Sequence, residues 1–472
     1  MTRTPAETLQ TFIKRQDAPT LAAVLLELAE SHDAVRERLT RLQLADRPDK
    51  LAAVGFRKTL NGWRRSTRFL TGRDAREFGL ELEAWLDQVA RELAPKSPPA
   101  ALDLFQAFIE SDHLFFERAD DSDGAVGDAV RAACRHWLQA AAACESPPYE
   151  WPGRVVELFA ADAYGARDEL LRRADLLFDE AALRGLVSQF EARMEQAVAG
   201  SSSAGRPSSE VFRASAALSL LAQALRDPDV KVRAVLRYSP DPNPMQRMDF
   251  VHAYLDVDRP GDALAWLQGS WGFQDDTRQS LLAQALERLG RFDESLPIRQ
   301  ATFERSLAVY DLQRWLEHLP EDWRAAALSR ARSLALDHDD PTTAAALLLE
   351  IGDDEGAEAI LLADPARIHG NDYGSLVPLA KLLRERELWR AETAVYRALL
   401  TGILDRALAR AYVHAARYWA RLREIADTGV DLSPLGAHTD FEAMIKSRHP
   451  RKSAFWARVK DQRQDEAEDD EA

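Results

Sequence analysis

The sequence predicts an all-α protein arranged as an α-solenoid, in which successive helix pairs stack on one another. Apolar residues recur at helical spacing in several long segments. Apolar and polar residues rarely alternate in the way that strands bounded by hairpin turns require. A helix–turn–helix pattern also repeats between about residues 250 and 400, which is typical of solenoids. A plain helical bundle with similar turns is the alternative.

The N-terminal residues 1–198 are expected to form an irregular array of helices. Pro19 suits the first turn of a helix over residues 21–43, because its missing amide hydrogen is not needed there. The apolar positions on one face of that helix are Leu21, Val24, Leu25, Leu28, Val35, Leu39 and Leu42. A second apolar stripe comprises Phe78, Leu82, Trp85 and Val89. Proline-containing breaks are expected at residues 95–99, 146–153 and 238–244.

The repeat is clearest in residues 281–307, which read LLAQALERLGRFDESLPIRQATFERSL. A first helix ends at Gly290, Phe292 fills the turn, and a second helix follows. This unit resembles a tetratricopeptide repeat. Ser295 and Pro297 depart from the pattern, because small or ordinary helical residues usually stand there. The sequence therefore predicts degenerate tetratricopeptide-like units.

Neighbouring units must stack, because one helix pair cannot bury its apolar face alone. Four equivalent positions, each 31 residues from the next, are Asp262, Asp293, Arg324 and Glu355. We therefore expect a tetratricopeptide-like superhelix with a C-terminal cap over residues 210–460. The low-complexity stretch around SSSAGRPSS predicts a linker at residues 199–209. The tail 461–472 carries seven acidic residues and is expected to be disordered.

The net charge of the chain is −16, which argues against a general nucleic-acid-binding protein. Cys134 and Cys144 fit no CxxC metal or redox pattern, and so few cysteines suit a reducing cytoplasm. The N-terminal residues contain no apolar segment of the kind found in secretory signals, so none is expected. No stretch approaches 18 uncharged apolar residues, so we expect no membrane association.

The common catalytic signatures are missing from the sequence. It contains no GxxxxGK[ST], GxGxxG, HExxH or GxSxG motif, so we expect no enzymatic activity and no cofactor. His414, His438 and His449 lie near the C-terminus, but no two share the i, i+4 spacing of a helical metal pair. Capping or packing is the favoured role for them.

The loop at residues 119–130 carries a weak candidate cation site at Asp120, Asp121 and Asp123. It lacks the full spacing of an EF-hand and the final glutamate. The favoured interpretation is a turn that caps the following helix, whose positive N-terminus attracts carboxylates.

Residues 56–76 hold seven Lys or Arg against one Asp. On a helix, one apolar stripe would comprise Phe56, Leu60, Trp63 and Leu70. The opposite side, called here the basic face, would comprise Arg57, Lys58, Arg64, Arg65 and Arg68. The favoured interpretation is a solvated surface near the carboxylates of Glu81, Glu83 and Asp87. A phosphate-bearing partner, an acidic protein and the acidic tail of the same chain are the alternatives.

The segment SRHPRKSAFW at residues 447–456 combines basic and aromatic side chains. Its candidate residues are His449, Arg451, Lys452, Phe455 and Trp456. A nucleic-acid site would interleave exposed aromatics with the cations, and a metal or catalytic site is a further alternative. We expect the two aromatics to dock on the last repeat and close its open end, with the cations pointing outward.

Three blocks of the chain resemble an uncharacterised bacterial family of helical-repeat proteins, a domain of unknown function. They are residues 20–39, residues 117–130, and a block from residues 399–422 to residues 438–456. Related helical arms resemble those that accompany SWIM-type zinc fingers. The CxC and CxH ligands of that finger are absent here, so neither the zinc nor a DNA role is carried over. The resemblance implies a cytoplasmic helical scaffold and supplies no catalytic residue.

The sequence thus predicts a non-catalytic scaffold that binds a protein or peptide partner in a curved groove. Trp266, Trp271 and Trp389 could anchor a partner there, although core packing is the favoured role of each. The alternative is a nucleic-acid-associated accessory protein that uses the basic face.

Overall fold

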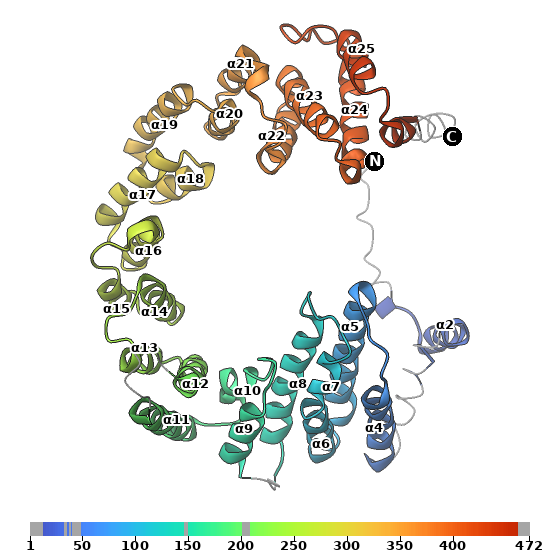
Figure 1. Cartoon of the computed structure of the whole chain (residues 1–472), viewed down its shortest axis with the longest axis vertical. Coiled ribbons are helices and arrows are strands. Elements are labelled where there is room, and N and C mark those ends of the chain that lie inside the picture. The colour runs from blue at the N-terminus through green and yellow to red at the C-terminus, as the bar shows by residue number, and fades with distance from the viewer. Residues whose placement is uncertain are drawn as a thin grey trace. The chain divides into compact units, whose positions relative to one another are not determined.

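The computed structural model describes residues 13–32, 35–36, 39, 49–145, 150–200 and 208–460. Across these residues the protein is helical and forms no strand, which confirms the all-α prediction (Figure 1). None of the helices in these ranges has the length and apolar character that a membrane span needs.

The chain forms two compact units, Met1–Arg259 and Pro260–Ala472. Most of the expected linker, residues 201–207, lies outside the described residues. The helices on either side of it, α11 (Glu180–Gly200) and α12 (Ser209–Leu225), pack against each other. The boundary between the two compact units therefore lies nearer the C-terminus than the expected linker does. The acidic tail 461–472 also lies outside the described residues.

Prolines start many helices of the first unit. Its helices besides α11 and α12 are α2 (Ala18–Ser31), α4 (Asp49–Arg65), α5 (Gly72–Gln88), α6 (Pro98–Ile109), α7 (Asp112–Phe116), α8 (Ala125–Ala142), α9 (Trp151–Ala160), α10 (Glu169–Arg172), α13 (Pro228–Tyr238) and α14 (Pro244–Asp256). A short π-helix, η1 (Val89–Leu93), and a short 3₁₀ helix, η2 (Ala174–Leu176), complete it. Helices α6, α9, α13 and α14 carry proline in their first two positions, where its fixed φ favours a helix start. The predicted breaks are thus also starting points.

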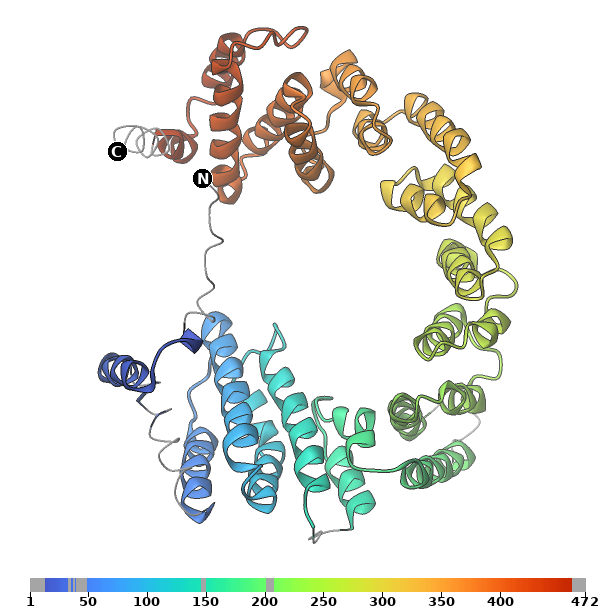
Figure 2. The same cartoon turned by 180° about the vertical axis from the view of Figure 1, so that it is seen from behind.

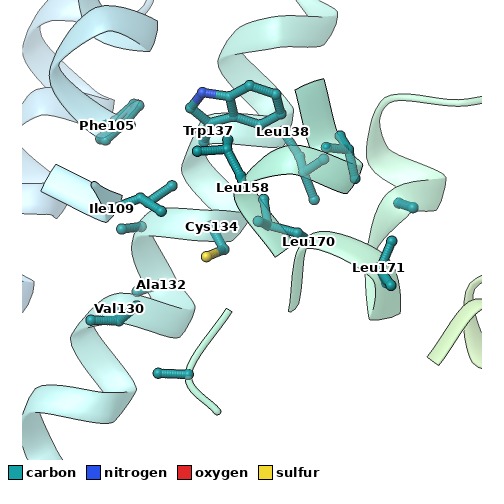
Figure 3. Packing of buried hydrophobic residues seen from close by; sticks show 14 of the residues in the cluster. Phe105, Ile109, Val130, Ala132, Cys134, Trp137, Leu138, Leu158, Leu170 and Leu171 are labelled. Atoms are coloured by element: carbon teal, nitrogen blue, oxygen red, sulfur yellow. The ribbon is translucent and has the colours of Figure 1, made fainter. Parts of the chain in front are cut away.

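The core of the first unit is built around α5, α6 and α8. All four residues of the predicted second stripe are buried, which confirms it: Phe78, Leu82, Trp85 and Val89. Figure 3 shows Cys134 and Trp137 of α8 among apolar side chains of α6, α9 and α10. Close approach of α5 to α8 requires a glycine, because a Cβ on Gly79 would lie 2.5 Å from the Cβ of Ala125.

The prediction for the first helix is wrong in two respects. Helix α2 ends at Ser31, and its apolar residues Val24, Leu25 and Leu28 are exposed in the structure. The Ser31 hydroxyl donates to carbonyls of the last turn, and the backbone of His32 is extended, so α2 is interrupted there. The described residues 35, 36 and 39 are again helical, and Leu42 lies outside the described residues. The start is as expected, with Pro19 in the first turn.

Helix pairs succeed one another along the second unit (Figures 1 and 2). Its helices are α15 (Pro260–Trp266), α16 (Asp275–Arg288), α17 (Phe292–Ser306), α18 (Val309–Glu317), α19 (Glu321–Leu336), α20 (Pro341–Glu350), α21 (Asp354–Ala363), α22 (Tyr373–Glu385), α23 (Trp389–Asp405), α24 (Tyr412–Asp427) and α25 (His438–Arg448). Short turns are η3 (Gly272–Gln274), η4 (Pro365–Arg367) and η5 (Ala409–Ala411), and a helical segment covers residues 453–460. Most helices pack against the next one along the chain, and α20 also contacts α18 and α22.

The 31-residue register coincides with this succession of helices. Its four positions lie in the first turns of α15, α17, α19 and α21, which are every second helix. Gly290 has a φ of +70°, so it can end the first helix of its pair. Phe292 begins α17 rather than filling the turn.

Candidate functional site

Helix α4 is anchored to the core by its buried residues Phe56 and Leu60. It carries four of the five cations of the basic face, whereas Arg68 lies beyond its end. The helix ends at Arg65, so the expectation that Leu70 extends the same stripe is wrong. The Arg118 guanidinium donates to the carbonyl of Trp63 over 3.0 Å and supplies a partner near the helix end. Leu70 instead bridges to Ala119, with its amide donating to the Arg118 carbonyl over 2.8 Å.

All five cations of the basic face are exposed. Arg68 pairs with Asp74 over 2.9 Å. The other four form no ion pair within the described ranges, and the carboxylates expected to shield them, Glu81, Glu83 and Asp87, do not pair with them there. Arg64 and Arg65 lie in the last helical turn, where positive charge is favoured by the helix dipole. The face is an open cationic surface on an acidic chain.

The aspartates of the 119–130 loop bond to neighbouring backbone and side-chain groups. The Asp121 carboxylate accepts hydrogen bonds from the amides of Val126 (2.7 Å) and Gly127 (2.9 Å), in the first turn of α8. Asp120 accepts from the hydroxyl of Ser122, and Asp123 accepts from the Ala125 amide over 3.5 Å. These bonds suit the N-terminus of a helix. Among the described residues, no cluster of three or more His, Cys, Asp or Glu could hold a metal ion.

The C-terminal candidates divide into packed aromatics and outward cations. Phe455 is buried, with its ring 6.1 Å from those of both Tyr412 and Trp419 in α24. The Trp456 indole donates to the carbonyl of His449 over 2.9 Å. Arg451 is exposed and Lys452 is half-buried. Because both aromatics of residues 447–460 contribute to packing, this segment offers no stacking platform for bases.

The three histidines near the C-terminus lie in different environments. Burial lowers the pKa of His449, although the Asp405 carboxylate 3.2 Å away opposes that shift. Burial also lowers the pKa of His438, with Glu442 opposing it. His414 is exposed on α24. These side chains therefore do not converge on one site.

The tryptophans proposed as groove anchors are at least partly committed to packing. Trp271 is buried, and Trp266 and Trp389 are half-buried. The guanidinium of Arg421 lies over the ring of Trp389, 5.6 Å from its centroid. Trp271 is therefore not available to a partner.

A groove between α17 and α19, which sequence reasoning missed, has a volume of about 710 Å³. Trp323 stands at its edge with 67% of its surface exposed, while Trp315 and Leu319 are buried beneath. The available signal was a tryptophan in the first turn of a predicted helix, between Asp322 and Arg324. Such a position faces solvent in an amphipathic helix, and a large apolar side chain there is uncommon.

Exposed aromatic side chains also mark the starts of several helices in the second unit. Phe273 is 95% exposed, and Tyr310 and Tyr373 are each 67% exposed. All three lie within two residues of the start of α16, α18 or α22, the first helices of three of the four pairs from α16 to α23. The first helix of the remaining pair, α20, begins with Pro341 and has no aromatic residue there. They are called here the edge aromatics.

The comparison with protein families matches residues 10–458 to a family of unknown function, DUF6880. Neither the curated proteins nor the solved structures gave a match.

Proposed function

Because the chain belongs to DUF6880, a family of unknown function, we propose its role from its own geometry: a non-catalytic helical-repeat scaffold that binds a protein or peptide partner. The helix pairs of the second unit are taken as degenerate tetratricopeptide-like repeats in a superhelix. The coincidence of the 31-residue register with every second helix supports that assignment. A cytoplasmic location, a bacterial origin and kinship to the helical arms of SWIM-type proteins belong to the same proposal.

The edge aromatics carry this proposal. In a stack of repeats the first helices run in the same direction, so their N-terminal ends lie along one edge. Exposed aromatics at equivalent places would form a row there, rather than the isolated apolar residues that any surface contains. Aromatic side chains are also the residues that most often anchor protein interfaces. The row would give an extended partner several anchors.

Site-specific photo-crosslinking in cells tests the proposal. A photoreactive phenylalanine analogue is placed at Tyr310 or Tyr373 of the full chain, with Phe212 in α12 as an exposed aromatic control. The proposal expects one and the same protein to be crosslinked from both edge positions and not from the control. If the edge positions capture only the background that the control captures, the scaffold assignment is wrong.

The open basic face favours a second function, a nucleic-acid-associated accessory protein. Four of its five cations are unpaired within the described part of the chain, and each could displace a counterion from a phosphate backbone. The excess of acidic residues opposes it, because a net charge of −16 repels polyanions at long range.

Binding to a short DNA duplex at several salt concentrations tests the second function. Losing two phosphate contacts through Arg64→Glu with Arg65→Glu should reduce the slope of log affinity against log salt by about 2. Arg291→Glu with Arg305→Glu changes the charge equally at ion-paired positions and serves as the control. Unchanged DNA binding in the first double variant would exclude this function for the basic face.

A further inference from the structure

We infer that the α17–α19 groove takes an extended peptide that presents a lysine or arginine beside an apolar residue. The inference rests on the proposed scaffold function and names the partner chemistry at one site. Residues of α17, of α18, of α19 and of the turn between α18 and α19 line the groove. Figure 1 shows where these three helices follow one another along the chain. Its apolar lining includes Leu296, Pro297, Trp315, Leu319, Trp323 and Ala327.

The free charge of the groove is negative. Asp293 and Asp322 line it, are exposed, and form no ion pair within the described ranges. Arg330 also lines it, but Glu304 neutralises it through two contacts of 3.1 and 3.3 Å. A partner side chain that enters here therefore meets carboxylates without competing cations, which favours a cation.

The backbone carbonyl of Asp293 adds a further hydrogen-bond acceptor to the groove. Pro297 lies inside α17 and has no amide hydrogen, so the Asp293 carbonyl lacks the donor that residue 297 normally supplies in a helix. The carbonyl and carboxylate of this residue can both receive N–H groups. The exposed face of Trp323 can in addition hold a cation against its ring. These features fit a guanidinium or ammonium group on an apolar stem.

The dimensions of the groove favour a peptide over a small amine. Lining residues run from Asp293 to Gln300 on α17 and from Asp322 to Arg330 on α19. At 1.5 Å of rise per residue these stretches are about 10–12 Å long, the length of about three residues of extended chain. The apolar floor can then hold a side chain next to the cationic one.

Selection from a random dodecapeptide library displayed on phage tests the inference with the full chain as bait. Clones are counter-selected on Trp323→Ala, and the winners are measured as synthetic fluorescent peptides. We expect enriched sequences with Lys or Arg within three residues of an apolar residue. Trp323→Ala should weaken their binding at least about tenfold, and Asp293→Asn with Asp322→Asn about fivefold. Asp337→Asn with Asp339→Asn, an equal loss of two charges at exposed positions outside the groove, should leave affinity unchanged.

Several results would overturn the inference. They are the absence of clones above the counter-selected background, enriched sequences without a basic residue, and equal affinity for the Asp→Asn pair and the wild type. Self-association that Trp323→Ala abolishes in sedimentation experiments would assign the groove to a second copy of this chain instead. Crosslinking from the edge aromatics does not depend on the groove, so its success alongside a failed selection would leave the scaffold proposal standing.

Discussion

Local opening of the α16–α18 region should become far more frequent with Arg299→Met than with Arg291→Met. Each of the two arginines donates two hydrogen bonds to one glutamate. Arg299 donates to the Glu287 carboxylate over 2.7 and 2.8 Å, and both side chains are buried. Arg291 donates to Glu294 over 2.6 and 2.7 Å at the surface. The two pairs belong to the same helix hairpin and differ in two ways. The Arg299–Glu287 pair is buried and joins α17 to α16, whereas the Arg291–Glu294 pair is exposed and local.

The magnitudes follow from desolvation. Removing one partner of a buried pair costs about 3 kcal/mol, because the other charge stays in a poorly solvated place. An exposed pair contributes at most about 1 kcal/mol. In Arg299→Met, Glu287 keeps its second ion-pair partner, Arg314, at 3.0 Å. We therefore take the lower end of the usual cost of breaking a buried pair. Local opening should therefore become about a hundredfold more frequent in Arg299→Met and at most about fivefold in Arg291→Met.

Hydrogen–deuterium exchange with mass spectrometry on the full chain measures this locally. Global denaturation is unsuitable, because a chain with two compact units need not unfold in one step. Replacing both partners, as Glu287→Met with Arg299→Met, should recover most of the lost protection, since no buried charge is then left from this pair. Equal exchange in the two single variants would refute the reasoning.

Four further outcomes are expected. Gly79→Ala should lower the local stability of α5 and α8 by about 1–3 kcal/mol in hydrogen–deuterium exchange, because its Cβ would meet Ala125, whereas Gly62→Ala in α4, with open space around it, should stabilise that helix by about 0.5–1 kcal/mol. Burial raises the pKa of the Cys134 thiol far above its usual range, so iodoacetamide should leave Cys134 unlabelled at pH 8 until the protein is unfolded; labelling in the native state would contradict this. Hydrogen bonds from Arg278 and from the Trp271 amide hold the pKa of Asp275 well below its usual range. The stability that this carboxylate contributes is present at neutral pH and is lost as the pH falls below about 4, so Asp275→Asn should reduce the loss of protection in α16 between pH 7 and pH 3. Burial lowers the pKa of His449, so its folded form binds fewer protons than the unfolded chain; stability should fall as the pH drops below about 6.5, and His449→Gln should remove that part of the pH dependence in exchange measurements on α25.

The sequence predicted the all-α character of the fold because helical periodicity is a local property. The stripe from Phe78 to Val89 is buried as its spacing predicts, and prolines lie at helix starts. The same periodicity failed for α2, where Val24 and Leu25 are exposed in the structure. An apolar stripe indicates which face of a helix can be buried but not what covers it. The end of a helix depends on local hydrogen bonds that compete with those of the helix backbone, such as the one from the Ser31 hydroxyl.

The candidate site was less predictable, because it depends on contacts between distant residues. The basic face was found from composition alone, but its apolar stripe was drawn too long. The end of α4 depends on Arg118, more than fifty residues away in the chain. The groove could not be found from sequence at all, since Asp293 and Asp322 line one groove only once α17, α18 and α19 have packed. Trp323 was the one local sign of it.

In the second unit, two buried glutamates each form ion pairs that join three consecutive helices, and this bears on the proposed function. Glu287 of α16 holds Arg299 of α17 and Arg314 of α18. Glu392 of α23 is bonded to Arg421 of α24 over 2.8 Å and lies 3.8 Å from Arg384 of α22. Apolar packing tolerates small shifts between helices, whereas a two-pronged arginine–carboxylate bond fixes their registration.

The fixed positions of these helices matter for the proposed function, because the edge aromatics would bind a partner as a row of anchors. The edge aromatics Tyr310 and Tyr373 start α18 and α22, which are helices held by these two clusters. If the helices shifted, the anchors would lose their spacing, and a rigid partner would lose one contact or pay to follow the movement. Arg421→Met should therefore weaken crosslinking from Tyr373 more than from Tyr310, and an equal loss at both positions would show that the cluster acts only through overall stability.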